Sequence, residues 1–104
     1  KQILATAEAG CDAVELHTGL YANAVKDKTI EKRLNELRDG RDIAMTAGLI
    51  VHAGHGLTYR NIGPVARIEG LCEFNIGHSI ISRAVLTGIG PATEEMKMLI
   101  ETPL

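Results

Sequence analysis

Residues 49–56 read Leu-Ile-Val-His-Ala-Gly-His-Gly, a short apolar run that passes directly into histidine and glycine. The run has the length of a strand, and the glycines that follow it are typical of a loop. Two other stretches have the same form: residues 13–19, Ala-Val-Glu-Leu-His-Thr-Gly, and residues 72–79, Cys-Glu-Phe-Asn-Ile-Gly-His-Ser. The repetition predicts strands at 13–16, 49–51 and 72–76, each followed by a loop that contains histidine.

Segments with helical periodicity separate these runs. We expect helices at residues 1–9, 29–47, 61–68, 79–86 and 91–100, with Gly10 closing the first and Thr29 capping the second. The Asp39-Gly40 pair marks a candidate break in the second helix. Strands that alternate with helices predict an α/β fold with a parallel sheet whose strands are buried on both faces. A doubly wound sheet and a (β/α)₈ barrel both satisfy this pattern.

The composition indicates one small, soluble globular domain. The chain has 104 residues, of which 45% are hydrophobic and 23% charged, and its net charge is −2. Acidic and basic residues are interspersed, so neither nucleic acid nor a membrane surface is an expected partner. Cys11 and Cys72 have no metal or redox spacing and are predicted to be reduced and buried in a cytoplasmic protein. Because the chain starts at Lys1 in a helix-like segment, we expect it to be part of a longer protein.

All four histidines, His17, His52, His55 and His78, lie at or just beyond the end of a predicted strand. The carboxyl ends of parallel strands are where ligands and catalytic groups gather in α/β folds, so the histidines are predicted to share a functional site. The flanking glycines are expected where the backbone approaches a ligand or takes a positive φ; they are Gly54, Gly56 and Gly77.

Gly77-His78-Ser79 leads directly into a predicted helix, whose free N–H groups could bind a phosphate. The alternative is a turn glycine followed by Ser79 as a helix cap. Arg83 could contact the same phosphate or be a surface charge. Glu15 is the only charged residue in the first apolar run, and it is either an acid/base group or a structural carboxylate. No metal site is predicted, because His52 and His55 have no third ligand beside them in the sequence.

The three strand ends resemble those of pyridoxine 5′-phosphate synthases. The blocks that carry the resemblance are residues 15–22 (Glu-Leu-His-Thr-Gly-Leu-Tyr-Ala), 53–57 (Ala-Gly-His-Gly-Leu) and 71–84 (Leu-Cys-Glu-Phe-Asn-Ile-Gly-His-Ser-Ile-Ile-Ser-Arg-Ala). The resemblance implies that residues 1–104 are the C-terminal part of a single (β/α)₈ barrel domain, with its last three strand–helix units and an additional C-terminal helix. It also implies a cytoplasmic homo-octamer.

Enzymes of this family condense 1-deoxy-D-xylulose 5-phosphate with 3-amino-2-oxopropyl phosphate to pyridoxine 5′-phosphate, phosphate and water, without metal or organic cofactor. By resemblance, His55 would be the proton donor and Glu15 would stabilise the transition state. Gly56, Gly77 and His78 match positions that hold 3-amino-2-oxopropyl phosphate.

The chain departs from the family in two respects: His52 stands where the family usually has Asn, and the stretch 38–46, on an outer helix, is unusual for the family. In addition, the family's N-terminal strands, which carry further catalytic groups, are not among these residues. Because such a barrel needs about 250 residues, we expect that this segment alone neither closes a barrel nor catalyses the reaction. Two alternatives stay open: another phosphate-handling barrel isomerase or aldolase, and a non-catalytic phosphate-binding module.

Overall fold

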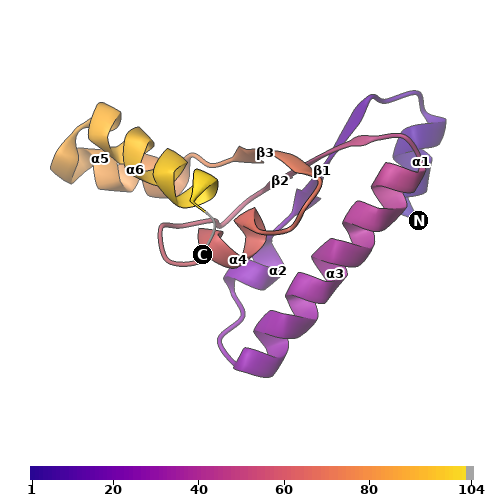
Figure 1. Cartoon of the computed structure of the whole chain (residues 1–104), viewed down its shortest axis with the longest axis horizontal. Helices are drawn as coiled ribbons and strands as arrows, with labels where there is room; N and C mark the ends of the chain where they lie inside the picture. The colour runs from indigo at the N-terminus through magenta and orange to yellow at the C-terminus, as the bar shows by residue number, and fades with distance from the viewer. Residues whose placement is uncertain (103–104) are drawn as a thin grey trace.

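The computed structural model describes residues 1–102, and Pro103 and Leu104, the end of the predicted domain, lie outside that range. Helices and strands alternate along the chain (Figure 1). In order they are α1 (Gln2–Glu8), β1 (Ala13–His17), α2 (Gly19–Ala22), α3 (Asp27–Thr46), β2 (Ile50–Gly54), α4 (Ile62–Ala66), β3 (Leu71–Asn75), α5 (His78–Thr87) and α6 (Ile89–Glu101). No helix among residues 1–102 is both long enough and apolar enough to cross a bilayer.

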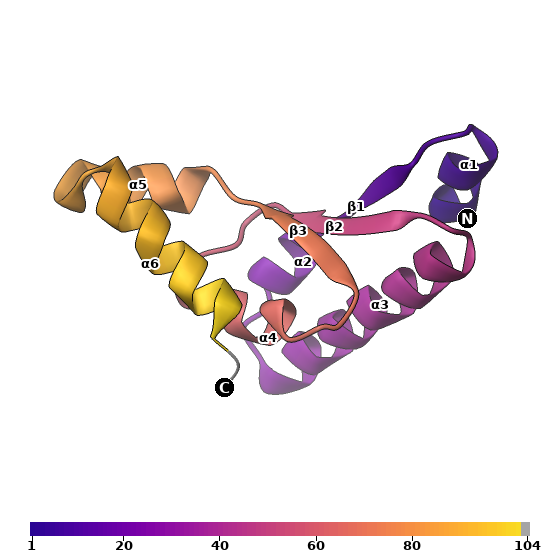
Figure 2. The same cartoon turned by 45° about the horizontal axis from the view of Figure 1, so that its top comes forward.

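The three strands form one parallel sheet in the order β1-β2-β3, as the alternating pattern predicted. Glu15 lies opposite His52 in the first pairing, and His17 lies opposite Gly54. The second pairing is irregular: Val51 lies opposite Leu71 and His52 opposite Glu73, so that Cys72 has no partner between them. Helices α2, α3 and α4 lie on the same side of the sheet (Figure 2).

The two faces of the sheet differ sharply. On the face that the helices cover, Leu16, Val51 and Ala53 are buried together with Leu37 of α3 and Val65 of α4. The other face, here called the open face, carries mostly polar side chains and is not covered by any described helix; it consists of Ala13, Glu15, His17, Ile50, His52, Gly54, Glu73 and Asn75. The prediction that the strands are buried on both faces is therefore wrong for residues 1–102, because the helices contact one face only.

Several predicted boundaries need correction. The second helix starts at Asp27 after Lys26, so Thr29 lies inside it and is not its cap. His52 lies in the middle of β2, whereas His78 is the first residue of α5. Both cysteines are exposed rather than buried: Cys11 lies in the turn before β1, and Cys72 is the extra residue of the irregular pairing.

Helix α3 is continuous through Asp39-Gly40, where a break was predicted. Gly40 is buried, and an added Cβ would meet Leu16 Cδ2 at 3.4 Å and Ile3 Cδ1 at 3.6 Å, which is close to ordinary van der Waals contact. The helix thus lies against Leu16 of β1 and Ile3 of α1 at a residue without a side chain.

Gly40→Ala is expected to raise the free energy of unfolding by about 0.5–1 kcal/mol, because Ala removes the helix-interior cost of Gly and fits the available space. Urea unfolding monitored by circular dichroism checks this. Gly40→Leu is the contrasting variant: its larger side chain would overpack the contact with Leu16, and it should lower stability. Equal stability of both variants would contradict the packing described.

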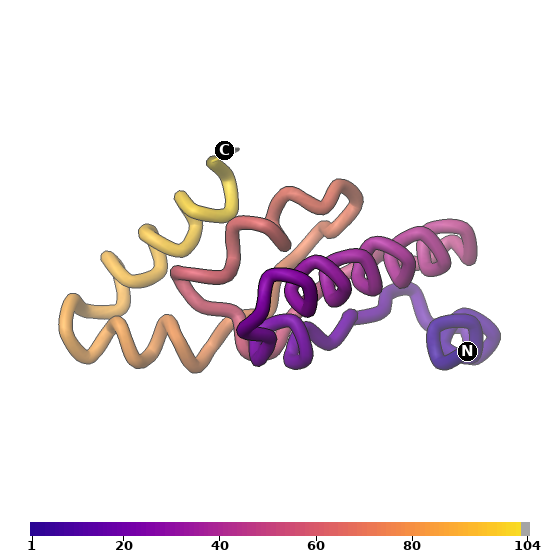
Figure 3. The backbone as a smooth tube through the Cα atoms, turned by 90° about the horizontal axis from the view of Figure 1, so that it is seen from below, coloured from indigo at the N-terminus to yellow at the C-terminus, as the bar shows by residue number. Residues whose placement is uncertain are grey.

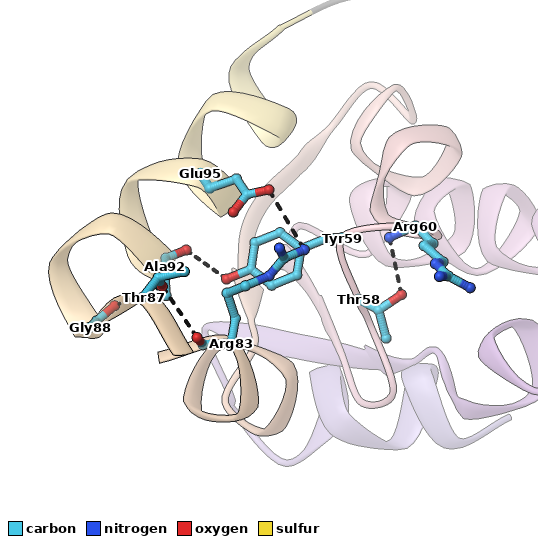
Figure 4. A network of polar contacts seen from close by, with 8 residues as sticks. All are labelled: Thr58, Tyr59, Arg60, Arg83, Thr87, Gly88, Ala92 and Glu95. Atoms are coloured by element: carbon cyan, nitrogen blue, oxygen red, sulfur yellow. Dashed lines mark hydrogen bonds and ion pairs between the residues drawn. The ribbon is translucent and has the colours of Figure 1, made fainter. Parts of the chain in front are cut away.

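Helices α5 and α6 form an antiparallel hairpin that extends away from the sheet (Figures 1 and 3). Ala92 and Met96 are buried where α6 packs against α4. The Tyr59 hydroxyl donates a hydrogen bond of 2.6 Å to the Ala92 carbonyl, and the Arg83 guanidinium lies 4.4 Å from the centre of the Tyr59 ring (Figure 4). Arg83 also lies 3.7 Å from Glu95. The contacts of Tyr59 attach the hairpin to the loop between β2 and α4, and the Arg83–Glu95 contact joins the two helices of the hairpin.

Tyr21 joins α2 to the same loop from the opposite side. It is 5% exposed, and its hydroxyl donates a hydrogen bond of 2.5 Å to the Asn61 carbonyl. Burial raises the pKa of Tyr21 above the ordinary value of 10.0, because the anionic form loses its hydration. The folded protein therefore keeps this proton to a higher pH than the unfolded chain does.

The contribution of Tyr21 to stability should be fully present below pH 10 and fall as the pH rises above 10, because only the unfolded chain then ionises readily. Tyr21→Phe should cost about 1 kcal/mol at neutral pH through the lost hydrogen bond, and it should show a shallower loss of stability above pH 10. Unfolding free energies between about pH 7 and pH 11.5 test this. Tyr59→Phe, which also removes a hydroxyl bonded to a backbone carbonyl, is the matched control. Parallel pH curves for wild type and Tyr21→Phe would contradict the assignment.

Candidate active site

An open pocket of about 820 Å³ lies beside the carboxyl ends of the strands and the start of α5. Its volume is within the range of small-molecule sites. The lining residues come from β1 and β3, from the loops after β2 and β3, and from α5: Glu15, His55, Gly56, Leu57, Thr58, Asn75, Ile76, Gly77, His78, Ser79, Ser82, Arg83 and Leu86.

Every residue selected as a site residue from the sequence lines this pocket: Glu15, His55, Gly56, Gly77 and His78. The other two histidines do not line it. His17 stacks on His55, and His52 Nδ1 lies 3.1 Å from the Glu73 carboxylate on the open face. His55 and His78 thus line one pocket. His17 lies against His55 outside the pocket, and His52 lies apart from it on the open face.

The Glu15 carboxylate lies across β2 toward β3. Asn75 donates a hydrogen bond of 2.6 Å from its Nδ2 to Glu15 Oε1. Gly54 lies beneath this contact, and an added Cβ there would be 2.8 Å from the Asn75 carbonyl and 2.9 Å from Glu15 Oε1. Glycine at position 54 is therefore required by the close approach of Asn75 and Glu15, rather than by the ligand contact or positive φ that the sequence predicted. Asn75 was not selected from the sequence, although its place at the end of β3 was a usable signal.

The backbone at His55 is strained. His55 has a φ of +93°, and it is the only non-glycine residue with a positive φ among residues 1–102. Such residues cluster at functional sites, where the surrounding structure holds them in place. Gly56 follows with a φ of +75°, and an added Cβ would lie 2.7 Å from the Ala22 Cβ. The expected positive φ is thus present at Gly56, whereas Gly77 has a φ of −124° and no close neighbour at its Cβ position.

Gly77 is the N-terminal cap of α5, and no side chain caps this helix. The Ser79 hydroxyl instead donates a hydrogen bond of 2.7 Å to the Leu57 carbonyl, so the predicted alternative of Ser79 as the cap is wrong. This bond ties the start of α5 to the loop that carries His55. The helix start and the Arg83 guanidinium give one side of the pocket positive character, while Glu15 supplies a carboxylate.

The described part of the site has few side chains that could bind a metal ion. Among the residues that the structure describes, no group of three or more His, Cys, Asp or Glu side chains could hold a metal ion. The arrangement can bind an anion, move a proton at an imidazole, and stabilise a developing positive charge with a carboxylate.

Comparisons with known proteins agree on one family. A sequence model described as "Pyridoxal phosphate biosynthesis protein PdxJ" matches residues 1–102. The chain is similar to the pyridoxine 5′-phosphate synthase of Syntrophotalea carbinolica, with 53% identity over 96% of this chain and 42% of the relative. It is also similar to those of Trichlorobacter lovleyi (50% identity; 99% and 43%) and Gloeothece citriformis (52%; 93% and 40%). The chain thus spans about two fifths of the length of these curated relatives.

Proposed function

Because the chain belongs to the PdxJ family of pyridoxal phosphate biosynthesis proteins, we propose that it forms the C-terminal part of a pyridoxine 5′-phosphate synthase. The observation that carries the proposal is the pocket, where His55, Glu15 and the start of α5 lie together. The relatives share about half of their aligned residues with this chain, but they extend well beyond it.

In this proposal, residues 1–104 supply the last three strand–helix units of a (β/α)₈ barrel, followed by the additional helix α6. Two features support a barrel over a doubly wound sheet: the strands lie in sequential order, and their connecting helices lie on one side. The open face, with Glu15, His52 and Glu73, would then face the barrel interior. Polar side chains on a barrel's inner face find partners there, which explains why this face is not apolar.

The proposed reaction joins the amine of 3-amino-2-oxopropyl phosphate to the ketone of 1-deoxy-D-xylulose 5-phosphate. Two water molecules and one phosphate leave, and a carbon–carbon bond closes the pyridine ring. The phosphate of the amino substrate would bind the N–H groups at Gly77 and His78, beside Gly56. His55 would give a proton to a departing oxygen, and the Glu15 carboxylate would stabilise positive charge near the reacting nitrogen.

The test is turnover by the full-length protein. Purified protein with both substrates should release inorganic phosphate and pyridoxine 5′-phosphate in equal amounts, measured by a phosphate assay and by chromatography. Residues 1–104 expressed alone should give no turnover. Binding of inorganic phosphate by the full-length protein without product formation would favour the non-catalytic module and contradict the proposal.

A homo-octamer and a cytoplasmic location follow from the same family membership as further proposals. The hairpin of α5 and α6 supports assembly, because it leaves Val85 81% and Ile89 58% exposed outside the pocket. Light scattering of the full-length protein after size-exclusion chromatography measures the oligomer directly.

A further inference from the structure

His17 has no place in the proposed reaction, yet it makes the closest aromatic contact in the site. It is the last residue of β1, and its imidazole stacks on that of His55 with ring centres 4.3 Å apart and an angle of 25° between the planes. His17 does not line the pocket that contains His55. One face of the His55 ring is thus covered by His17.

The His17 ring is itself held in one orientation. The Gly19 N–H donates a hydrogen bond of 3.2 Å to His17 Nδ1, which acts as the acceptor and leaves the proton of the neutral ring on Nε2. A Cβ added at Gly19 would lie 2.5 Å from His17 Cε1 and 3.2 Å from His55 Cδ2. Any side chain at position 19 would therefore displace the stacked rings.

Thr18, which lies between His17 and Gly19 in the sequence, holds the backbone of His55. Thr18 is fully buried, its hydroxyl donates a hydrogen bond of 2.6 Å to the His55 carbonyl, and its N–H donates one of 2.8 Å to the Gly54 carbonyl. His17, Thr18 and Gly19 together hold both the ring and the strained backbone of His55. These three consecutive residues lead from the end of β1 into α2, and they contact Gly54 and His55 at the end of β2.

From this geometry we infer that His17 is a positioning residue, whose imidazole is a platform that fixes the His55 ring toward the pocket. The inference rests on the proposed function, in which His55 is the proton donor. A proton donor must be aligned with its acceptor, and a displacement of about 1 Å can cost about 100-fold in rate. His17 acts through His55 and does not contact the substrate.

Two substitutions in the full-length protein separate the ring of His17 from its hydrogen bond. His17→Phe keeps a stacking ring and removes the acceptor for Gly19, whereas His17→Asn keeps an acceptor and removes the ring. We expect His17→Asn to lower kcat by about 10–100-fold with KM for both substrates within about threefold, and His17→Phe to keep kcat within about fivefold of wild type. Wild-type kcat in His17→Asn, or an equal loss in His17→Phe, would overturn the inference.

A second readout does not depend on turnover. The rate at which diethyl pyrocarbonate modifies His55 at neutral pH, followed by mass spectrometry of the His55 peptide, should rise in His17→Asn, where the ring face is uncovered, and should stay near wild type in His17→Phe. Equal modification rates in all three proteins would overturn the positioning role. If the three proteins show this pattern of modification rates but the wild type has no turnover, the proposed function fails while the positioning role stands. His17→Gln replaces His17→Asn if the latter does not fold, as judged by circular dichroism.

Discussion

Replacement of His55 by Asn in the full-length protein is expected to lower kcat by about 10²–10⁴-fold, the usual contribution of a positioned general acid. KM for both substrates should change by only about threefold, because the proposed phosphate contacts at Gly77 and His78 would be untouched. Asn suits this position, since it tolerates a positive φ better than most residues and His55 has a φ of +93°. The variant thus removes the imidazole and preserves the backbone of the loop.

His52→Asn is the matched control. It makes the same substitution three residues earlier, at a side chain that pairs with Glu73 and does not line the pocket. We expect its kcat to stay within about threefold of wild type, because the lost contact with Glu73 is partly exposed and lies outside the pocket. Steady-state kinetics of both variants decide the matter: wild-type turnover by His55→Asn would remove His55 from the mechanism, and an equal loss in both would show that the effect is not specific to the pocket.

The sheet could be predicted from the sequence because each strand is a short apolar run ended by glycine. Three such runs at 13–16, 49–51 and 72–76 gave the strands to within a few residues, and parallel pairing followed from the helices between them. The prediction that both faces of the sheet are buried was wrong for the described residues. The polar partners of Glu15, His52 and Glu73 lie on neighbouring strands, so these residues can be recognised as one polar face only when the strand register is known. Helix α2 has four residues, too few to show a helical period.

The pocket could be predicted for a general reason: the ends of parallel strands meet at one edge, so histidines that follow the strands come together. Which histidines meet depends on register, and this is where the sequence was insufficient. His52 and His55 are three residues apart, yet one faces Glu73 in the middle of β2 and the other faces the pocket. The contact between Asn75 and Glu15 joins residues sixty positions apart, and no local pattern signals it.

Glu15→Gln is expected to lower kcat by about 10²–10³-fold, the magnitude seen when one preorganised electrostatic group is removed from a transition state. The substitution is nearly isosteric, and the carbonyl oxygen of the introduced amide can still accept the hydrogen bond from Asn75 Nδ2. The change therefore removes the negative charge and little else. KM for 3-amino-2-oxopropyl phosphate should stay within about threefold, because the Glu15 carboxylate is not a donor to a phosphate.

Glu73→Gln is the control for Glu15→Gln, because it neutralises a second carboxylate on the open face that does not line the pocket. It should keep kcat within about threefold of wild type and weaken only the partly exposed contact with His52. Thermal unfolding of both variants separates a loss of catalysis from a loss of folded protein. If Glu15→Gln turned over at the wild-type rate, Glu15 would be the structural carboxylate that the sequence left open, with Asn75 as its partner, and the charge in the pocket would have to come from a residue outside this chain.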